Sequence, residues 1–526
     1  MTNLSDLFPA GAGKQVSFVA DGAVGAAGKP VVLTALGKVA QVAESTSGAT
    51  MPYGTSTGYT WSTSANKYQG STVEFDPITA GRIGISFINS SNYPCIIIGT
   101  RSTTSITWGT PVVIQSYACL GSCAFAFDSQ NVNQVAVLYY FRASSGSNHG
   151  FQGRSGTISG TDASATVTFG AAVVLNGVDT YAVNEKSIPP QSVIFDPSAS
   201  GTVCFSYQDW SVTKTYLRSA TISGNVLTMG TEKDLGTDIK DERYRSLIVN
   251  TSGTLALTYR SGTGSLPTSI ITGGISGGTI TTSAATTISS AGGSYTQGNF
   301  DPNNPTKLGV AYEDGTDGKV QIVTLNSASG GGSATITTGT EIVFSTANPT
   351  VEIPCFNPAL DTEFVVSYKR DDTGYENDLA VVSCTYDKTS TSNTITVGTT
   401  YQVWDRTAIA FPYYEYTAGW DNGVFGITLI RDDNDDGTLL LCKASSVDTN
   451  LTSTNFIGIS DEAILDTASG NVTIKGGIAV TGLSSLTPGS DYYAQTDGTI
   501  STSSSGDAVK IGKAMSATSI NLEYQS

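Results

Sequence analysis

The fold of this chain follows from a stretch of five residues, Leu308-Gly309-Val310-Ala311-Tyr312. Large apolar side chains alternate in it with small ones, so a strand formed here has one bulky face and one thin face. Six further copies of the pattern occur, at steps of 52 to 68 residues. They occupy residues 83–87, 135–139, 203–207, 255–259, 364–368 and 425–429. A period of this size indicates a repeat architecture with seven units.

The two unlike faces predict how the units pack. Packed sheets lie ~10 Å apart, so a bulky face must meet a thin face if the gap is to fill without voids. Units with unlike faces stack head to tail, and such a stack either grows into a fibre or closes into a ring. Sheets of four strands arranged in a ring form a propeller. We therefore predict an all-β fold, a seven-bladed β-propeller of four-stranded blades.

Two further markers keep the register of the repeat. A turn with Asp or Asn before Pro precedes most copies, as in Phe75-Asp76-Pro77. Pro fixes φ in such a turn, and the polar side chain bonds back to the backbone. A second marker, such as Ile106-Thr107-Trp108-Gly109, follows each of the first six copies. It predicts the start of the outermost strand of each blade.

The seventh copy lacks the second marker after Val447, but a similar stretch, Tyr59-Thr60-Trp61-Ser62, precedes the first copy. We predict that this early strand completes the seventh blade and closes the ring. The alternative is an open stack of the same repeats. An open stack would expose two end sheets and need capping repeats, which the sequence lacks.

Composition narrows the classes of partner. The chain has 526 residues, a net charge of −17 and only 13% charged residues. Nucleic acid and anionic membranes require cationic patches, so we expect neither as a partner; an acidic surface without a partner explains the charge equally well. No apolar run reaches about 18 residues, which predicts no membrane insertion. The start of the chain does not resemble a secretory signal, so we expect synthesis in a cytoplasm. Seven scattered cysteines predict neither a disulfide framework nor a zinc site.

The sequence outside the ring predicts a second, smaller unit. Alternating apolar residues and Pro-Gly or Asp-Gly turns in both flanks are typical of short hairpins. A closed ring brings the two flanks together at one blade, so we expect them to form a single β base. The predicted domains are an N-terminal flank at 1–52, the propeller at 53–454 and a C-terminal β module at 455–526.

The C-terminal flank resembles a small β module of tailed-bacteriophage virion structural and tail-fibre proteins. The resemblance rests on Phe456-Ile457-Gly458-Ile459, a Gly-x-Val-Thr-Ile strand at 470–474, Leu-Thr-Pro-Gly and Tyr-Tyr within 486–493, and Gly-x-Ala at 512–514. The N-terminal flank looks like the segment that accompanies this module. The resemblance implies location in a virion, contacts with other virion proteins through the base, and a homo-oligomer. It supplies no catalytic residues and does not cover the propeller.

Turns between the second and third strands of the blades should lie on one rim of the ring. Binding residues often lie on loops held by a rigid scaffold, and aromatic faces combined with planar polar groups suit sugars. The residues on or near this rim that we predict to contact a ligand are Trp210, Tyr244, Arg245, Tyr375 and His149. The alternative for each of them is an ordinary solvated turn residue.

One rim turn resembles half of a calcium loop. Asp432, Asn434 and Asp436 alternate as oxygen ligands do, and a Gly follows them. The second half has Leu440 and Lys443 where oxygen ligands would be needed. A solvated acidic turn is therefore the favoured interpretation, with Ca²⁺ as the alternative, and we expect no cofactor.

These features predict a non-catalytic bacteriophage fibre or adhesin component that presents the rim to a host surface polysaccharide or receptor. One alternative is a propeller glycoside hydrolase, a depolymerase. The chain lacks the Ser-x-Asp-x-Gly-x-Thr-Trp turns of sialidase-like rings, but carboxyl spacing cannot be read from a sequence. The other alternative is a purely structural capsid decoration or head fibre.

Overall fold

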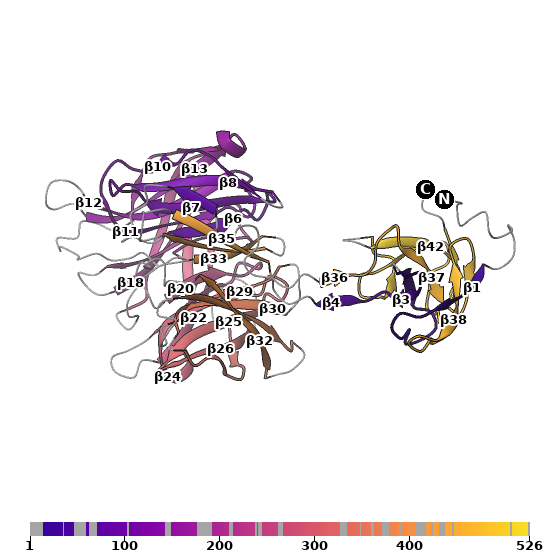
Figure 1. Ribbon diagram of the computed structural model, residues 1–526. Helices are drawn as coiled ribbons and strands as arrows, with labels where there is room; N and C mark the ends of the chain where they lie inside the picture. The colour runs from indigo at the N-terminus through magenta and orange to yellow at the C-terminus, as the bar shows by residue number, and fades with distance from the viewer. Residues whose placement is uncertain are drawn as a thin grey trace. The chain divides into compact units, whose positions relative to one another are not determined.

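The computed structural model describes most of the chain (Figure 1). The residues that it leaves undescribed are 1–13, 35, 47–58, 63–70, 103–104, 143–148, 176–191, 210–213, 237–238, 240–244, 261–266, 327–333, 348, 359–361, 371–377, 389–391, 405–416, 422–423, 431–436, 444–446, 505–507 and 524–526.

The chain divides into two compact units. Residues Ala49–Ala444 form one of them, a seven-bladed β-propeller. Within each blade the strands are antiparallel, and the repeat found in the sequence supplies the second strand. In the part of the chain that the structure describes, the one helical element is a 3₁₀ turn, η2 (Asp162–Ser164), and no helix could span a membrane.

The first three blades follow one another in the sequence. Blade 1 contains β6 (Thr72–Phe75), β7 (Arg82–Ile88), β8 (Pro94–Arg101), β9 (Ile106–Trp108) and β10 (Val112–Val113). Blade 2 contains β11 (Cys119–Phe127), β12 (Gln134–Arg142), β13 (His149–Ser159), β14 (Thr166–Phe169) and β15 (Val173–Val174). Blade 3 contains β16 (Val193–Phe195), β17 (Thr202–Asp209), β18 (Lys214–Ser223) and β19 (Val226–Asp234).

Blades 4 and 5 share one long strand, β24 (Thr286–Phe300). Its first half pairs with β22 as an outer strand of blade 4, and its second half pairs with β25 as the first strand of blade 5. Blade 4 also contains β20 (Arg245–Val249), β21 (Leu255–Arg260), β22 (Pro267–Ser276) and β23 (Thr279–Thr282). Blade 5 also contains β25 (Lys307–Asp314), β26 (Asp317–Leu325), β27 (Ile336–Thr338) and β28 (Ile342–Ser345).

The N-terminal strand closes the ring, as the sequence predicts. Strand β5 (Tyr59–Ser62) pairs antiparallel with β35, with Leu439 opposite Tyr59. Blade 6 contains β29 (Thr350–Phe356), β30 (Glu363–Lys369), β31 (Leu379–Tyr386) and β32 (Ile395–Trp404). Blade 7 contains β33 (Thr417–Asp421), β34 (Val424–Ile430), β35 (Gly437–Lys443) and β5. In Figure 1, β33 and β35 lie beside β6 and β7 of blade 1, from the other end of this unit's sequence.

Small residues on the second strands make room for aromatic rings of the next blade. A Cβ added at Gly84 would lie 2.9 Å from the ring of Phe127, and one at Gly309 would lie 3.0 Å from the ring of Phe356. Each ring belongs to the Phe that ends the first strand of the following blade. The thin face of one blade therefore receives the bulky face of the next, which is the packing that the repeat predicts.

The Asp or Asn that recurs in the turns after the first strands has a structural role there. In blades 1 to 5, a buried side chain at the start of the turn accepts a hydrogen bond at 2.8–3.0 Å from the backbone N–H two residues later. The side chains are Asp76, Asp128, Asp196, Asn250 and Asp301. These carboxyl and amide groups hold the turn, as expected for Asx turns.

The second compact unit comprises Met1–Gly48 and Ser445–Ser526 and is the β base. Its first sheet interleaves the two flanks in the order β1-β38-β37-β2-β3. These strands are β1 (Gln15–Val19), β38 (Ser469–Ile474), β37 (Phe456–Ser460), β2 (Pro30–Leu33) and β3 (Val39–Gln41). The two flanks therefore fold as one body.

A second sheet covers the first, with the order β39-β43-β42-β40-β41. Phe456 and Ile459 of the first sheet share one core with Ile511 and Ile520 of the second. The strands are β39 (Ile478–Ala479), β43 (Ser519–Leu522), β42 (Val509–Ser516), β40 (Asp491–Ala494) and β41 (Ile500–Ser501).

A two-stranded ribbon of β4 (Glu44–Thr46) and β36 (Val447–Thr449) joins the two flanks next to the points where the chain leaves and re-enters the base. The division between the units at 48/49 and 444/445 assigns β36 to the base, whereas the boundaries expected from the sequence assign it to the propeller.

Candidate functional site

Most of the ligand residues expected from the sequence lie outside the described residues. Trp210, Tyr244 and Tyr375 belong to this group, as do the expected calcium ligands Asp432, Asn434 and Asp436. His149 begins β13 of blade 2 and Arg245 begins β20 of blade 4, and only their backbones are described. The predicted rim site therefore stays a prediction. Within the described ranges, no group of three or more His, Cys, Asp or Glu residues could hold a metal ion.

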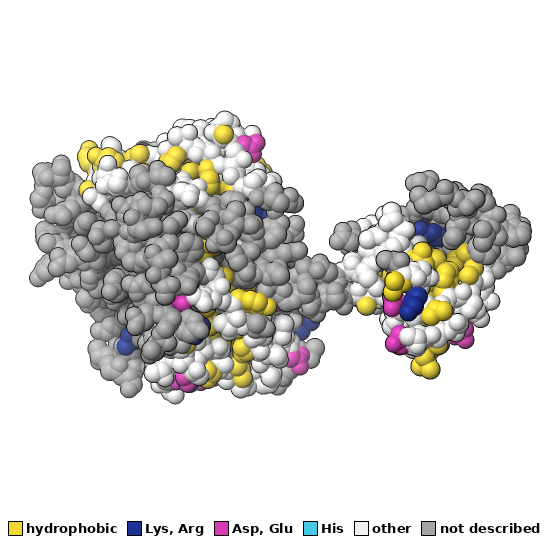
Figure 2. All heavy atoms as spheres, in the orientation of Figure 1, with side chains coloured by type: hydrophobic (Ala, Val, Ile, Leu, Met, Phe, Trp, Pro, Cys, Tyr) yellow, Lys and Arg dark blue, Asp and Glu magenta, His cyan; other side chains and the backbone are white. Residues whose placement is uncertain are grey.

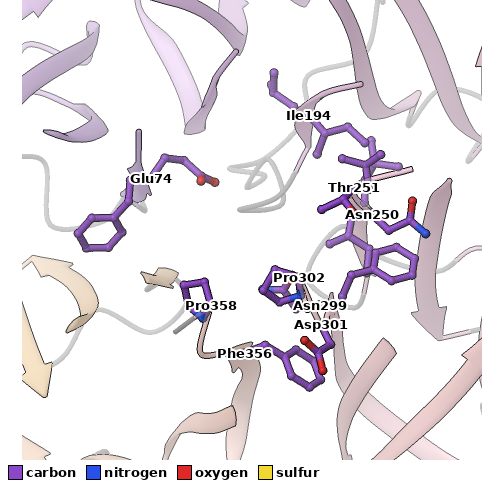
Figure 3. Close-up of a pocket in the computed structure, with 15 residues that line it drawn as sticks. Glu74, Ile194, Asn250, Thr251, Asn299, Asp301, Pro302, Phe356 and Pro358 are labelled. Atoms are coloured by element: carbon purple, nitrogen blue, oxygen red, sulfur yellow. The ribbon is translucent and has the colours of Figure 1, made fainter. Parts of the chain in front are cut away.

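The described residues do line a partly open central cavity of about 320 Å³ in the propeller (Figure 3). The first strands of blades 1, 3, 4, 5 and 6 and the turns that follow them form its walls. The lining residues are Glu74, Phe75, Val193, Ile194, Leu247, Ile248, Val249, Asn250, Thr251, Asn299, Phe300, Asp301, Pro302, Phe356 and Pro358.

The position of the cavity follows from the topology. In an antiparallel blade, the turn after the first strand and the turn after the second strand lie at opposite ends of the sheet. The cavity includes turns of the first kind, at Asn250 and Asp301, whereas the ligand site expected from the sequence uses turns of the second kind. The cavity is therefore a different site from the predicted rim.

Glu74 is the polar side chain that stands out in this cavity. It lies on β6 immediately before the Phe that ends the strand, and Figure 3 shows its carboxyl group directed into the open space. The equivalent residues of blades 3 and 4, Ile194 and Ile248, are apolar. Blade 5 has Asn299 and blade 6 has Cys355 at this position.

The walls of the cavity withdraw Glu74 from bulk water although the side chain is only half-buried. This desolvation raises the pKa of Glu74 to about 8. Burial also raises the pKa of the Cys355 thiol to about 12; the Asn299 side chain opposes this increase in the pKa, and the charge of Glu74 adds to it. No Lys, Arg or His is among the described residues that line the cavity. No cation among the described lining residues therefore stabilises the ionised form of Glu74.

The other polar groups of the lining are mostly engaged in the turns. Asp301 accepts hydrogen bonds from two backbone N–H groups, from the side chain of Asn304 and from the hydroxyl of Tyr386. The Oδ1 of Asn250 accepts hydrogen bonds from two backbone N–H groups, and its Nδ2 donates one to the carbonyl of Pro305.

Asn299 and Glu74 are not held in this way. The Nδ2 of Asn299 lies 3.9 Å from the Cys355 sulfur, and its Oδ1 accepts no hydrogen bond from any residue that the structure describes. Glu74 makes no hydrogen bond or ion pair within the described residues. These two side chains, together with the exposed Thr251 in the turn after β20, are the ones that a molecule in the cavity could engage.

Repeat comparison could have found Glu74 from the sequence. The first strands of the seven blades can be compared with one another at equivalent positions. Glu74 stands out in that comparison, because the equivalent residue is apolar in most of the other six blades. The strand pattern alone does not reveal that this position faces a cavity.

Comparison with known proteins gives distant structural similarity only. The sequence matches no family model, and no curated protein matches it. Sqt1 of Saccharomyces cerevisiae is 12% identical, with 81% of this chain and 100% of that chain covered and a TM-score of 0.42. The WD40 domain of Toxoplasma gondii coronin is 8% identical, with 80% and 89% covered and a TM-score of 0.45. The BP39L lectin of Burkholderia pseudomallei is 9% identical, with 73% and 99% covered and a TM-score of 0.46. Similarity at this level says nothing about ligand or activity.

Proposed function

We propose that this protein is a non-catalytic component of a bacteriophage particle that displays the propeller to the host surface. In this proposal the β base attaches to other virion proteins and the rim of the ring binds a host surface polysaccharide. The protein is made in the host cytoplasm and joins the virion during assembly, as a homo-oligomer. The main support is the connectivity of the chain. A closed ring is inserted between two flanks that fold together into a base, so one unit can be held while the other is presented.

The surface of the base supports its role in attachment. Figure 2 shows apolar side chains at the surface of this unit. Ile478 on β39 is 51% exposed and Met515 on β42 is 60% exposed. They alternate with the buried Ala479 and Ala514, so both point away from the core of the base. Contiguous apolar patches are typical of surfaces that bind another protein, and we propose that Ile478 and Met515 belong to such a patch.

The described lining of the cavity gives no support for a hydrolase site there. Glycoside hydrolysis commonly requires two carboxyl groups with separate tasks. Two acidic residues line the cavity, and one of them, Asp301, is engaged by four hydrogen bonds in its turn. That leaves Glu74 without a second carboxyl group among the described lining residues.

Binding of the whole protein to purified host surface polysaccharide tests the proposed function. We expect Trp210→Ala and Tyr375→Ala to weaken binding at least tenfold, since stacking on an aromatic face is lost. Tyr493→Phe is the control, because Tyr493 is a partly exposed aromatic residue on β40 of the base. Release of reducing sugar during the assay would contradict the non-catalytic proposal.

Attachment through the base is tested separately with phage particles. We expect Ile478→Lys combined with Met515→Glu to reduce incorporation into particles while the propeller still binds polysaccharide. Incorporation at the level of the unaltered protein would show that this face of the base is not the attachment surface.

A further inference from the structure

We propose that the central cavity of the propeller is a binding site for a small organic ammonium ion, with Glu74 as its counter-ion. This site is distinct from the rim used in the proposed function and does not depend on it. The inference rests on three features of the described residues: the walls, the unpaired carboxyl group and the commitment of the other polar groups.

Four apolar residues form part of the walls. Ile194, Ile248 and Phe300 line the cavity together with Phe356, from four different blades. A cavity of about 320 Å³ lies within the range of ligand pockets, about 300–1,000 Å³.

The charge of the lining fits a cation. Glu74 and Asp301 are its acidic residues, and the described lining contains no basic residue. A half-buried carboxylate without a partner among the described residues loses part of its solvation, so a ligand that brings a positive charge replaces the solvation that Glu74 lost. A net charge of −17 on the whole chain further favours cationic over anionic ligands.

The remaining polar groups exclude a metal ion and orient the ligand. Calcium requires six to eight oxygen ligands, whereas the described lining offers only Glu74 and the Oδ1 of Asn299 beyond the turns. An ammonium ion needs one counter-ion and apolar contacts. Asn299 would then accept a hydrogen bond from a hydroxyl or amine of the same ligand.

Proton linkage gives the site a signature. Among the described titratable groups, Asp301 lines the same cavity as Glu74, and Cys355 lies near enough for the charge of Glu74 to raise the pKa of its thiol. The carboxyl group of Asp301 is engaged by hydrogen bonds, including one from Tyr386. Burial raises the pKa of the Cys355 thiol to about 12, so this thiol stays protonated between pH 6 and pH 9. Only ionised Glu74 acts as a counter-ion. With a pKa of about 8, its ionised fraction rises from about 1% at pH 6 to about 90% at pH 9.

Calorimetric titration of the whole chain with choline tests this site. Choline carries a fixed positive charge, and 3,3-dimethylbutan-1-ol has the same shape without the charge. We expect choline to bind more than tenfold more tightly at pH 9 than at pH 6, because the affinity scales with the competent fraction of the protein. We expect the neutral alcohol to bind at least tenfold more weakly than choline at pH 9.

Two variants separate the site from general electrostatics. Glu74→Gln removes the counter-ion and keeps the shape, so it should abolish both choline binding and its pH dependence. Glu462→Gln removes one carboxylate from the base, where Gln can still accept the hydrogen bond from the Asn471 N–H, and should change neither. Equal binding of choline and the alcohol would overturn the proposal and indicate a site for neutral molecules. Unchanged choline binding by a folded Glu74→Gln variant, or the absence of choline binding at pH 9, would also overturn it.

Discussion

The indole ring of Trp61 and the ring of Phe87 pack with their centroids 4.6 Å apart and their planes tilted by 56°. Trp61 lies on β5, the strand that completes blade 7, and Phe87 lies on β7 of blade 1. Both side chains are buried, and they share one core with Leu439 and Leu441 of β35. This core closes the ring, because it joins the last blade to the first through a strand from the start of the chain.

Replacement of Trp61 by Ala should open this junction. The change removes a large buried side chain, and such truncations typically cost about 3–5 kcal/mol. We expect a lower urea midpoint for the propeller transition. Trp61→Phe should cost much less, since it keeps the aromatic contact and removes a buried indole N–H that has no acceptor among the described residues. Thr60→Ala, at an exposed position of the same strand, is the control and should change stability by less than about 0.5 kcal/mol. Equal effects of Trp61→Ala and Thr60→Ala would contradict closure by β5.

Replacement of Gly426 by Ala, on another strand of blade 7, should also destabilise this junction. A Cβ at this position of β34 would lie 2.7 Å from the ring of Phe75 on β6. We expect a cost of about 1–3 kcal/mol from overpacking. Gly25→Ala is the matched control, because the nearest atom to its added Cβ is 3.7 Å away.

The double variant Gly426→Ala with Phe75→Ala tests that contact directly. Its cost should be smaller than the sum of the two single costs, since the added methyl group then occupies space that the ring has left. Strict additivity in urea denaturation would show that Gly426 and Phe75 do not interact across the blade 7–blade 1 interface.

Replacement of Tyr386 by Phe should weaken the junction between blades 5 and 6. The hydroxyl group of Tyr386 on β31 donates a buried 2.6 Å hydrogen bond to the carboxyl of Asp301, in the turn before β25. Hydrogen bonds to charged groups contribute about 1.5–3 kcal/mol, so we expect a loss of that order in urea denaturation. Tyr117→Phe removes an exposed hydroxyl and should have no measurable effect. A loss from Tyr386→Phe no greater than from Tyr117→Phe would show that this bond does not join the blades.

The architecture could be predicted because it depends on patterns that repeat. Alternation of large and small residues on the second strands encodes the interfaces, and Gly309 against Phe356 shows the steric reason. The closing strand was predictable from a missing marker, and its pairing with β35 confirms it. The shared strand β24 was not predicted, because only backbone geometry decides whether one strand continues from blade 4 into blade 5.

The candidate site could not be predicted to the same extent. The aromatic and polar residues of the loops predicted a site on the rim. Trp210 and Tyr375, which were predicted to belong to it, are outside the described residues. The cavity depends on where five first strands converge, which is a property of ring closure rather than of any one segment. The sequence alone does not single out Glu74 as a site residue, because the rise in its pKa depends on how far the surrounding blades remove its carboxyl group from water.

The desolvation of Glu74 predicts a specific dependence of stability on pH. Its pKa is about 8 in the folded protein and 4.5 ordinarily, so the folded state binds the proton more tightly than the unfolded state. Stability from this group is therefore fully present below about pH 4.5, falls as the pH rises, and is lost above about pH 8. The Glu74→Gln variant cannot ionise, so its melting temperature should exceed that of the unaltered protein increasingly between pH 5 and pH 8. Glu462→Gln controls for the loss of one negative charge and should show no such trend. A constant difference in melting temperature across this range would mean that Glu74 is not desolvated, because an exposed carboxyl group titrates alike in both states.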